Sequence, residues 1–206
     1  MSDFEVTEPI LNSPFEEPRE YWWIVEGETP ERRSGRRFAH YFYRDPRAPL
    51  DPARASDVGT MIELKLVTRI RERLAAWRAQ GYPGASRTTV ELLRYWEREG
   101  RQQPLFFAQR EAAETIIFMA ESRADFRQGI DTPRDEPSDD KKAQGYAGFL
   151  RYACKMATGS GKSTVMAMLA AWSILNKIND RSDARFSDVV LLICPNVTIR
   201  DRLREL

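Results

Sequence analysis

The stretch KMATGSGKST, residues 155–164, decides how the rest of the chain is interpreted. Gly161, Lys162 and Ser163 match the second half of a phosphate-binding loop, whose full pattern is a glycine, four residues of any kind, and then Gly-Lys-Ser/Thr. Met156 stands where the first glycine of that pattern belongs. This position only begins the turn, so an ordinary residue is acceptable there if the two later glycines adopt the unusual backbone angles.

The residues on either side have the order of strand, loop and helix that a phosphate-binding loop requires. RYACKM (151–156) is a short strand candidate, and STVMAMLAAWSILNKI (163–178) is a strongly apolar helix. A polar connection leads to VVLLICP (189–195), an unalternated aliphatic run that suits a strand covered on both faces of a parallel sheet. This order predicts one right-handed βαβ unit.

The loop chemistry predicts a site for ATP with Mg²⁺. Backbone N–H groups around Gly159 and Gly161 would wrap the phosphates, and the dipole of the following helix favours anions. Lys162 would reach the β- and γ-phosphates, and the Ser163 hydroxyl would bind Mg²⁺. A flexible turn before a helix is the alternative, and it leaves the flanking strand and helix unexplained. The candidate nucleotide-binding residues of the loop are Thr158, Gly159, Ser160, Gly161, Lys162, Ser163 and Thr164.

The first half of the chain carries no comparable chemistry. YWWIVE (21–26) and FAHYFY (38–43) predict an antiparallel pair of strands, with an arginine cluster in residues 32–37 at its tip. These arginines would either contact phosphates or form a solvated cluster. Apolar residues at helical spacing, with a capping box at each start, predict helices over 60–80 and about 89–99. A third helix is predicted to follow Pro104.

Composition limits the function classes. The chain has 206 residues, is 42% hydrophobic and 31% charged, and carries a net charge of +1, which argues neither for nor against nucleic acid. The acidic start lacks an apolar segment, and no apolar run reaches membrane-spanning length, so we expect a cytoplasmic protein that does not contact a membrane. Cys154 and Cys194 are expected to be free, buried thiols.

Three segments resemble motifs of one enzyme family. MATGSGKS (156–163) resembles motif I of superfamily 2 helicases, especially in the restriction subunits of type III and also type I restriction enzymes, where the leading position often is not glycine. LFFAQREAAETI (105–116) looks like the adenine-reading Q motif, with Gln109 as the base reader; an ordinary exposed helix glutamine is the alternative. LLICPNVTIRDRL (191–203) is similar to motif Ia, which contacts the DNA backbone. The matching positions there are Asn196, Thr198 and Arg200, of which the first two could also cap a helix.

The resemblance implies an α/β fold. Residues 101–206 would form an incomplete, partial RecA-like P-loop domain with a parallel sheet and an exposed loop at about 127–145. Residues 1–100 would form an α+β N-terminal extension with a β-hairpin and amphipathic helices. The implied function is the N-terminal part of an ATP-dependent DNA translocase or helicase. Its implied partners are double-stranded DNA and a modification (methyltransferase) subunit.

Catalysis is not expected from this chain alone. It contains no motif that would supply a Mg²⁺-binding Asp-Glu pair and attacking water, and no arginine finger, so we predict no catalytic residue within it and negligible ATP hydrolysis. We expect either the front piece of a longer enzyme or a truncated reading frame, with a C-terminal half of low stability. The competing interpretations are a non-catalytic nucleotide-binding remnant or interaction module, and a small P-loop kinase.

Overall fold

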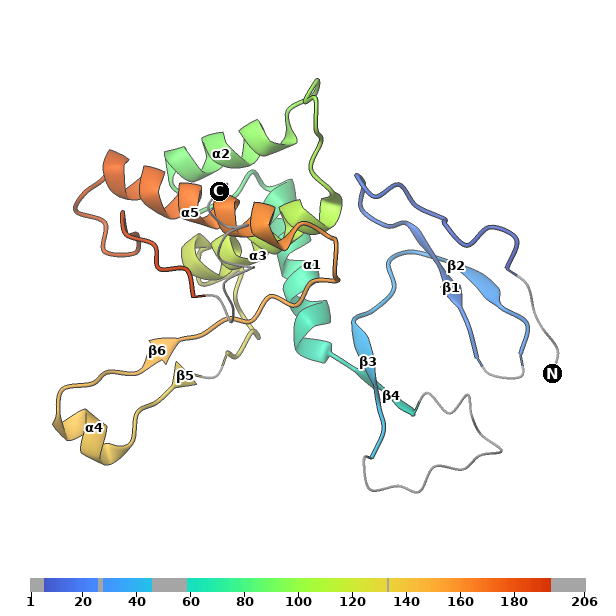
Figure 1. Cartoon of the computed structure of the whole chain (residues 1–206), viewed down its shortest axis with the longest axis horizontal. Coiled ribbons are helices and arrows are strands. Elements are labelled where there is room, and N and C mark those ends of the chain that lie inside the picture. The colour runs from blue at the N-terminus through green and yellow to red at the C-terminus, as the bar shows by residue number, and fades with distance from the viewer. Residues whose placement is uncertain (1–5, 26–27, 46–58, 133, 194–206) are drawn as a thin grey trace. The chain divides into compact units, whose positions relative to one another are not determined.

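The computed structural model describes residues 6–25, 28–45, 59–132 and 134–193 (Figure 1). Its internal contacts separate two units, Met1–Glu72 and Arg73–Leu206, and each unit is described by itself. The boundary near residue 100 that the sequence suggests is a different division and stays a prediction.

The first unit contains two antiparallel strand pairs (Figure 1). The strands are β1 (Glu20–Trp23), β2 (Glu31–Ser34), β3 (His40–Tyr43) and β4 (Thr60–Glu63). β1 pairs with β2, so that Trp22 lies opposite Arg32, and β3 pairs with β4. The chain enters β4 through Gly59, at a φ of +87°. A Cβ there would overlap the backbone carbonyl of Tyr43, so this position requires glycine.

The predicted partnership of the two aromatic segments is wrong, although both segments contain strands. Each pairs with a segment that sequence pattern does not mark as a strand. The Arg32 guanidinium bonds the Glu20 carboxylate across β1 and β2, and the Arg33 guanidinium lies 4.6 Å from the centre of the Trp23 ring. These cross-strand contacts stabilise a strand in the arginine-rich segment. Residues 60–63, predicted to begin a helix through a capping box, pair with β3 instead.

Five helices form in the described ranges, and the four longer ones fall where apolar periodicity predicts a helix, whereas the short one lies in the segment expected to be an exposed loop. They are α1 (Lys65–Ala79), α2 (Arg87–Glu97), α3 (Phe107–Glu121), α4 (Asp139–Ala143) and α5 (Lys162–Asn179). Gly81 ends α1 with a φ of +75°, as its position in the sequence predicts. Ser86 caps α2, because its hydroxyl accepts a hydrogen bond from the Thr89 amide at 3.0 Å.

The second unit is built around the packing of these helices. Its core includes Trp77 of α1 and Phe118 of α3, both fully buried, whose ring centres lie 5.6 Å apart at a steep angle. α5 packs against α2 and α3. Where the three helices meet, the Trp172 indole donates to the buried Glu121 carboxylate at 2.6 Å, and the Thr89 hydroxyl donates to the same oxygen at 2.6 Å.

The predicted RecA-like parallel sheet is wrong. Every strand pair in the described ranges is antiparallel, including the third one, β5 (Arg134–Asp135) with β6 (Phe149–Leu150). Residues 151–156 are not a strand, and neither is the described part of the aliphatic run, 189–193. The side chains of this run are exposed, by 81% at Leu191 for example. An apolar run forms a sheet only with partner strands, and in the described parts of the chain this run has none.

Three further predictions concern the segment 127–145, the two cysteines and membrane-spanning helices. The segment expected to be an exposed loop at 127–145 is mostly exposed, but it contains β5 and α4. Cys154 is free but exposed, so its predicted burial is wrong, and Cys194 lies outside the described residues. None of the helices in the described ranges has the length and apolar character needed to span a membrane.

Candidate functional site

The glycine loop has the backbone geometry that its sequence requires. Gly159 and Gly161 have φ angles of +79° and +83°, which is the left-handed region that other residues rarely adopt. Gly161 is the N-cap of α5, and no side-chain hydrogen bond caps this helix end. The first N–H groups of α5 have no acceptor within the helix and point out of its N-terminus. They are therefore available to an anion, which the helix dipole also favours.

The Lys162 side chain turns back over the loop that precedes it. Its Nζ donates to the carbonyl oxygen of Ala157 at 2.8 Å and to that of Met156 at 3.3 Å. The Ser160 hydroxyl donates to the same Ala157 oxygen at 2.7 Å. The ammonium group thus lies over the loop, where a phosphate bound to the loop amides would replace the two carbonyl oxygens as its partner.

The remaining loop residues are accessible. Thr158, Lys162 and Ser163 are exposed, and Thr164 is half-buried in the first turn of α5. A Cβ built on Gly159 meets no atom within 4 Å, so the space beside this glycine is open. The loop therefore has open space beside Gly159 for a ligand, and the role of the exposed Ser163 hydroxyl as a Mg²⁺ ligand stays a prediction. In the described ranges no group of three or more His, Cys, Asp or Glu side chains gathers as a metal site.

The fold brings Gln109 to this loop, although the two are far apart in the sequence. Gln109 lies in the first turn of α3 and is only 7% exposed, so it is not an ordinary exposed helix residue. Its Oε1 accepts a hydrogen bond from the Phe106 amide at 2.8 Å. Its Nε2 lies against Gly161, where a Cβ would overlap it. The amide therefore joins the start of α3 to the loop, and reading a base would require it to exchange partners.

The two aromatic residues beside Gln109 differ in accessibility. Phe107 is buried, and the guanidinium groups of Arg78 and Arg110 each lie 5.8 Å from its ring centre. Phe106 is 38% exposed. Of the two, Phe106 is therefore the ring that a nucleotide base could reach.

The two loop glycines predict different responses to alanine. Gly159→Ala should lower the free energy of unfolding by about 1–2 kcal/mol, because alanine disfavours the left-handed conformation. Gly161→Ala should lower it by more, because the new Cβ also overlaps the Gln109 amide. Urea unfolding of both variants measures the difference. In a Gln109→Ala background the excess should disappear, whereas an excess that persists there contradicts the contact.

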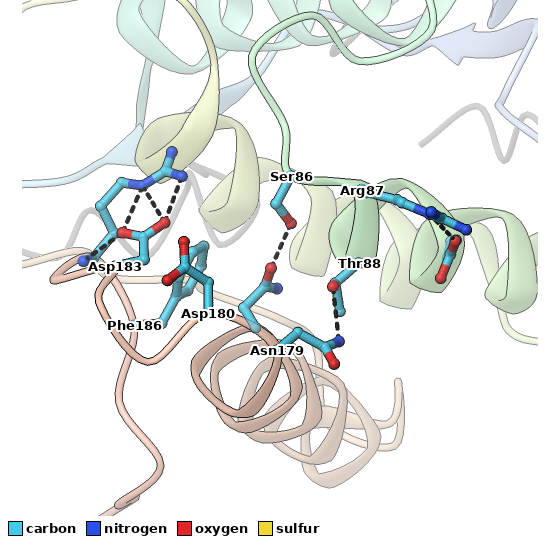
Figure 2. A pocket seen from close by; sticks show the side chains of 10 residues that line it. Ser86, Arg87, Thr88, Asn179, Asp180, Asp183 and Phe186 are labelled. Atoms are coloured by element: carbon cyan, nitrogen blue, oxygen red, sulfur yellow. Dashed lines mark hydrogen bonds and ion pairs between the residues drawn. The ribbon is translucent and has the colours of Figure 1, made fainter.

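The predicted DNA-contacting residues Asn196, Thr198 and Arg200 lie outside the described residues, so their role stays a prediction. Nothing in the sequence marks a second feature, a polar pocket of about 490 Å³ between the end of α5 and the start of α2 (Figure 2). Its two arginines are paired within the pocket: Arg87 with Glu91 at 2.8 Å, and Arg185 with Asp183 at 2.7 Å (Figure 2). Because these charged groups already pair with one another, they are not available to pair with a ligand.

Comparisons of the chain with protein-family models, with curated proteins and with solved structures find no match. The resemblance to helicase-like restriction subunits therefore depends on the three sequence motifs, and the features that favour a nucleotide site are the loop, Lys162 and Gln109.

Proposed function

We propose that the chain binds ATP with Mg²⁺ at the loop of residues 156–164, as part of an ATP-dependent DNA translocase or helicase resembling the restriction subunits of type III enzymes. One observation carries the nucleotide site. Two left-handed glycines lead into the uncapped start of an 18-residue helix, and the Lys162 ammonium lies 2.8 Å from a carbonyl oxygen of the same loop. Backbone amides, a helix dipole and a lysine together suit a triphosphate.

Each candidate residue has a role in this proposal. The N–H groups from Thr158 to Thr164 bind phosphate oxygens, Lys162 neutralises their charge, and Ser163 contributes its hydroxyl to Mg²⁺. Gln109, with Phe106 beside it, faces the base. The DNA and modification-subunit partners rest on the motif resemblance, with DNA contacted by Asn196, Thr198 and Arg200.

A titration of the full chain with a fluorescent ATP analogue tests the nucleotide site. We expect saturable binding that weakens when Mg²⁺ is chelated. Ser163→Ala should weaken binding about tenfold in Mg²⁺ and leave binding in the chelator unchanged, because it removes one ligand of a charged group. Ser160→Ala is the matched control, since its hydroxyl bonds the loop itself, and it should keep the full Mg²⁺ dependence. Equal behaviour of the two variants would contradict the assignment of Ser163.

A nucleotide-binding module without turnover is the second candidate. It is favoured by the lack of a parallel sheet in the described ranges, since such a sheet would position catalytic groups around the loop. Steady-state ATP hydrolysis in the presence of duplex DNA separates the two. Turnover that DNA stimulates and that Lys162→Ala abolishes supports the translocase, and ATP binding without turnover supports the module.

A further inference from the structure

A second pocket lies wholly within the first unit and is unrelated to the glycine loop. It has a volume of about 360 Å³, within the range of small-ligand sites. Residues 9–22 and 36–37 contribute to it, and Arg71 of α1 completes it. Three arginines and two aromatic residues line it: Arg36, Arg37, Arg71, Tyr21 and Trp22.

Arg37 is the unusual member of this group. Its Nε is buried and has no hydrogen-bond partner, although a buried charged donor without an acceptor is costly and rare. Its neighbours in sequence differ, since the Arg33 Nε lies 2.8 Å from a Glu31 oxygen and Arg36 lies 3.3 Å from a Glu17 oxygen. In the described ranges no carboxylate pairs with Arg37. The Arg37 guanidinium therefore lines the pocket with no counter-ion in the described ranges, and an anion in the pocket would supply one.

The charge and shape of the pocket identify the acceptor. The carboxylate that lines the pocket, that of Glu20, already accepts a hydrogen bond from Arg32 at 3.1 Å, and Arg36 is paired with Glu17, so the Arg37 guanidinium has no counter-charge among these groups. The excess of positive charge favours an oxyanion, and the guanidinium fork matches phosphate oxygens. The Trp22 side chain, on the same face of β1 as Glu20, adds flat apolar surface on which a base could stack. A phosphate joined to an aromatic ring fits this combination, and a nucleotide has that composition.

We propose that this pocket binds the phosphate group of a nucleotide, with Arg37 as its principal contact, either as a free nucleotide or as part of a single-stranded nucleic acid. Duplex DNA fits less well, because its bases are stacked inside and leave no ring for the aromatic side chains. This site is independent of ATP binding at the glycine loop.

The test measures binding of a fluorescein-labelled oligothymidylate of about ten nucleotides to the full chain by fluorescence anisotropy. Arg37→Met should weaken binding about tenfold, as expected for one lost charge-assisted contact. The slope of log affinity against log salt should become shallower by about 0.7. Arg19→Met is the matched control, since it removes the same charge from an exposed position outside the pocket, and it should change affinity less than about twofold.

The thermal unfolding midpoint separates binding from folding. Arg37→Met removes an unpaired buried donor, so the midpoint should stay the same or rise. Competition by thymidine monophosphate identifies a free nucleotide as the ligand, and binding of the oligonucleotide without such competition identifies a single strand. Unchanged binding by Arg37→Met, an equal loss in Arg19→Met, a lowered midpoint, or preference for a polyglutamate peptide would each overturn the proposal. Lys162→Ala should bind the oligonucleotide normally. A negative result for one of the two proposed sites therefore does not count against the other.

Discussion

Lys162→Ala is expected to weaken binding of ATP with Mg²⁺ by at least about a hundredfold. Two charge-assisted hydrogen bonds from the ammonium to phosphate oxygens are lost, and each contributes about 1.5–3 kcal/mol. The ammonium already reaches the interior of the loop, since it bonds the carbonyl oxygens of Met156 and Ala157. The fold should tolerate the change, because these contacts are exposed.

The control for this variant is Lys155→Ala, which removes the same charge from an exposed lysine just before the loop. It should leave affinity for the nucleotide within about twofold, because an exposed charge is largely screened by salt. Both variants are compared in the titration with the fluorescent ATP analogue, with unfolding curves as a check on the fold. Equal losses would assign the effect to general electrostatics, and no loss in Lys162→Ala would exclude the loop as the nucleotide site.

Arg78→Met is expected to lower the free energy of unfolding by about 3–5 kcal/mol near neutral pH, because it leaves a buried carboxylate without its cation. The Glu114 side chain is only 3% exposed. Its Oε2 accepts a hydrogen bond from the Arg78 Nε at 3.1 Å, and its Oε1 accepts one from the Tyr82 hydroxyl at 3.3 Å. The hydroxyl alone cannot compensate for burying the charge.

This loss should depend on pH. Burial raises the pKa of Glu114 above its ordinary value of 4.5, although Arg78 acts in the opposite direction. The folded state therefore holds this proton more tightly than the unfolded state, and stability falls as pH rises from 4.5 through the raised pKa. Without Arg78 the pKa rises further, so the fall extends to higher pH. The deficit of Arg78→Met should be smallest near pH 4.5 and largest above the raised pKa of the variant.

Urea unfolding at several pH values measures this dependence. Asp183, whose pKa the Arg185 side chain lowers to about 2, produces the opposite trend only below its ordinary value of 3.8, so the measurement stays above that pH. The double variant Arg78→Met/Glu114→Gln should lose the added pH dependence and regain part of the stability. If the double variant is as pH-dependent as Arg78→Met, Glu114 is not the responsible group.

The helices could be predicted from the sequence because their determinants are local. Apolar residues at helical spacing mark α1, α2, α3 and α5, and Gly81 ends α1 where its position predicts. Local signals fail where two short patterns compete. Thr60 and Glu63 match a capping box, but they belong to β4, because pairing with β3 decides their conformation.

The sheets could not be predicted because strand pairing is not local. Sequence pattern identifies residues suited to strands, whereas the partner is chosen by contacts between distant side chains. The arginines at 32 and 33 were expected at the tip of a hairpin, and they lie in β2 through contacts with Glu20 and Trp23. In the same way, the aliphatic run at 189–193 reads as a buried parallel strand, although it has no partner among the described residues.

The candidate site was predictable in part. The glycine conformations follow from the loop sequence, and the position of Lys162 at the start of a helix follows from the pattern. The proximity of Gln109 to Gly161 follows from the packing of the helices, and only the motif resemblance signals it. The buried Nε of Arg37 had no signal at all, because a cluster of arginines in sequence says nothing about which one is enclosed.

The exposed aliphatic run at 189–193 affects how the protein behaves in concentrated solution. Val189, Leu191 and Ile193 are 77%, 81% and 85% exposed, and no charge interrupts the run between them. Extended, uncharged, branched side chains of this kind adhere to one another when molecules are crowded. The chain should therefore aggregate at high concentration unless another surface covers these residues. Dilution or a charged tag beside the run should reduce this aggregation.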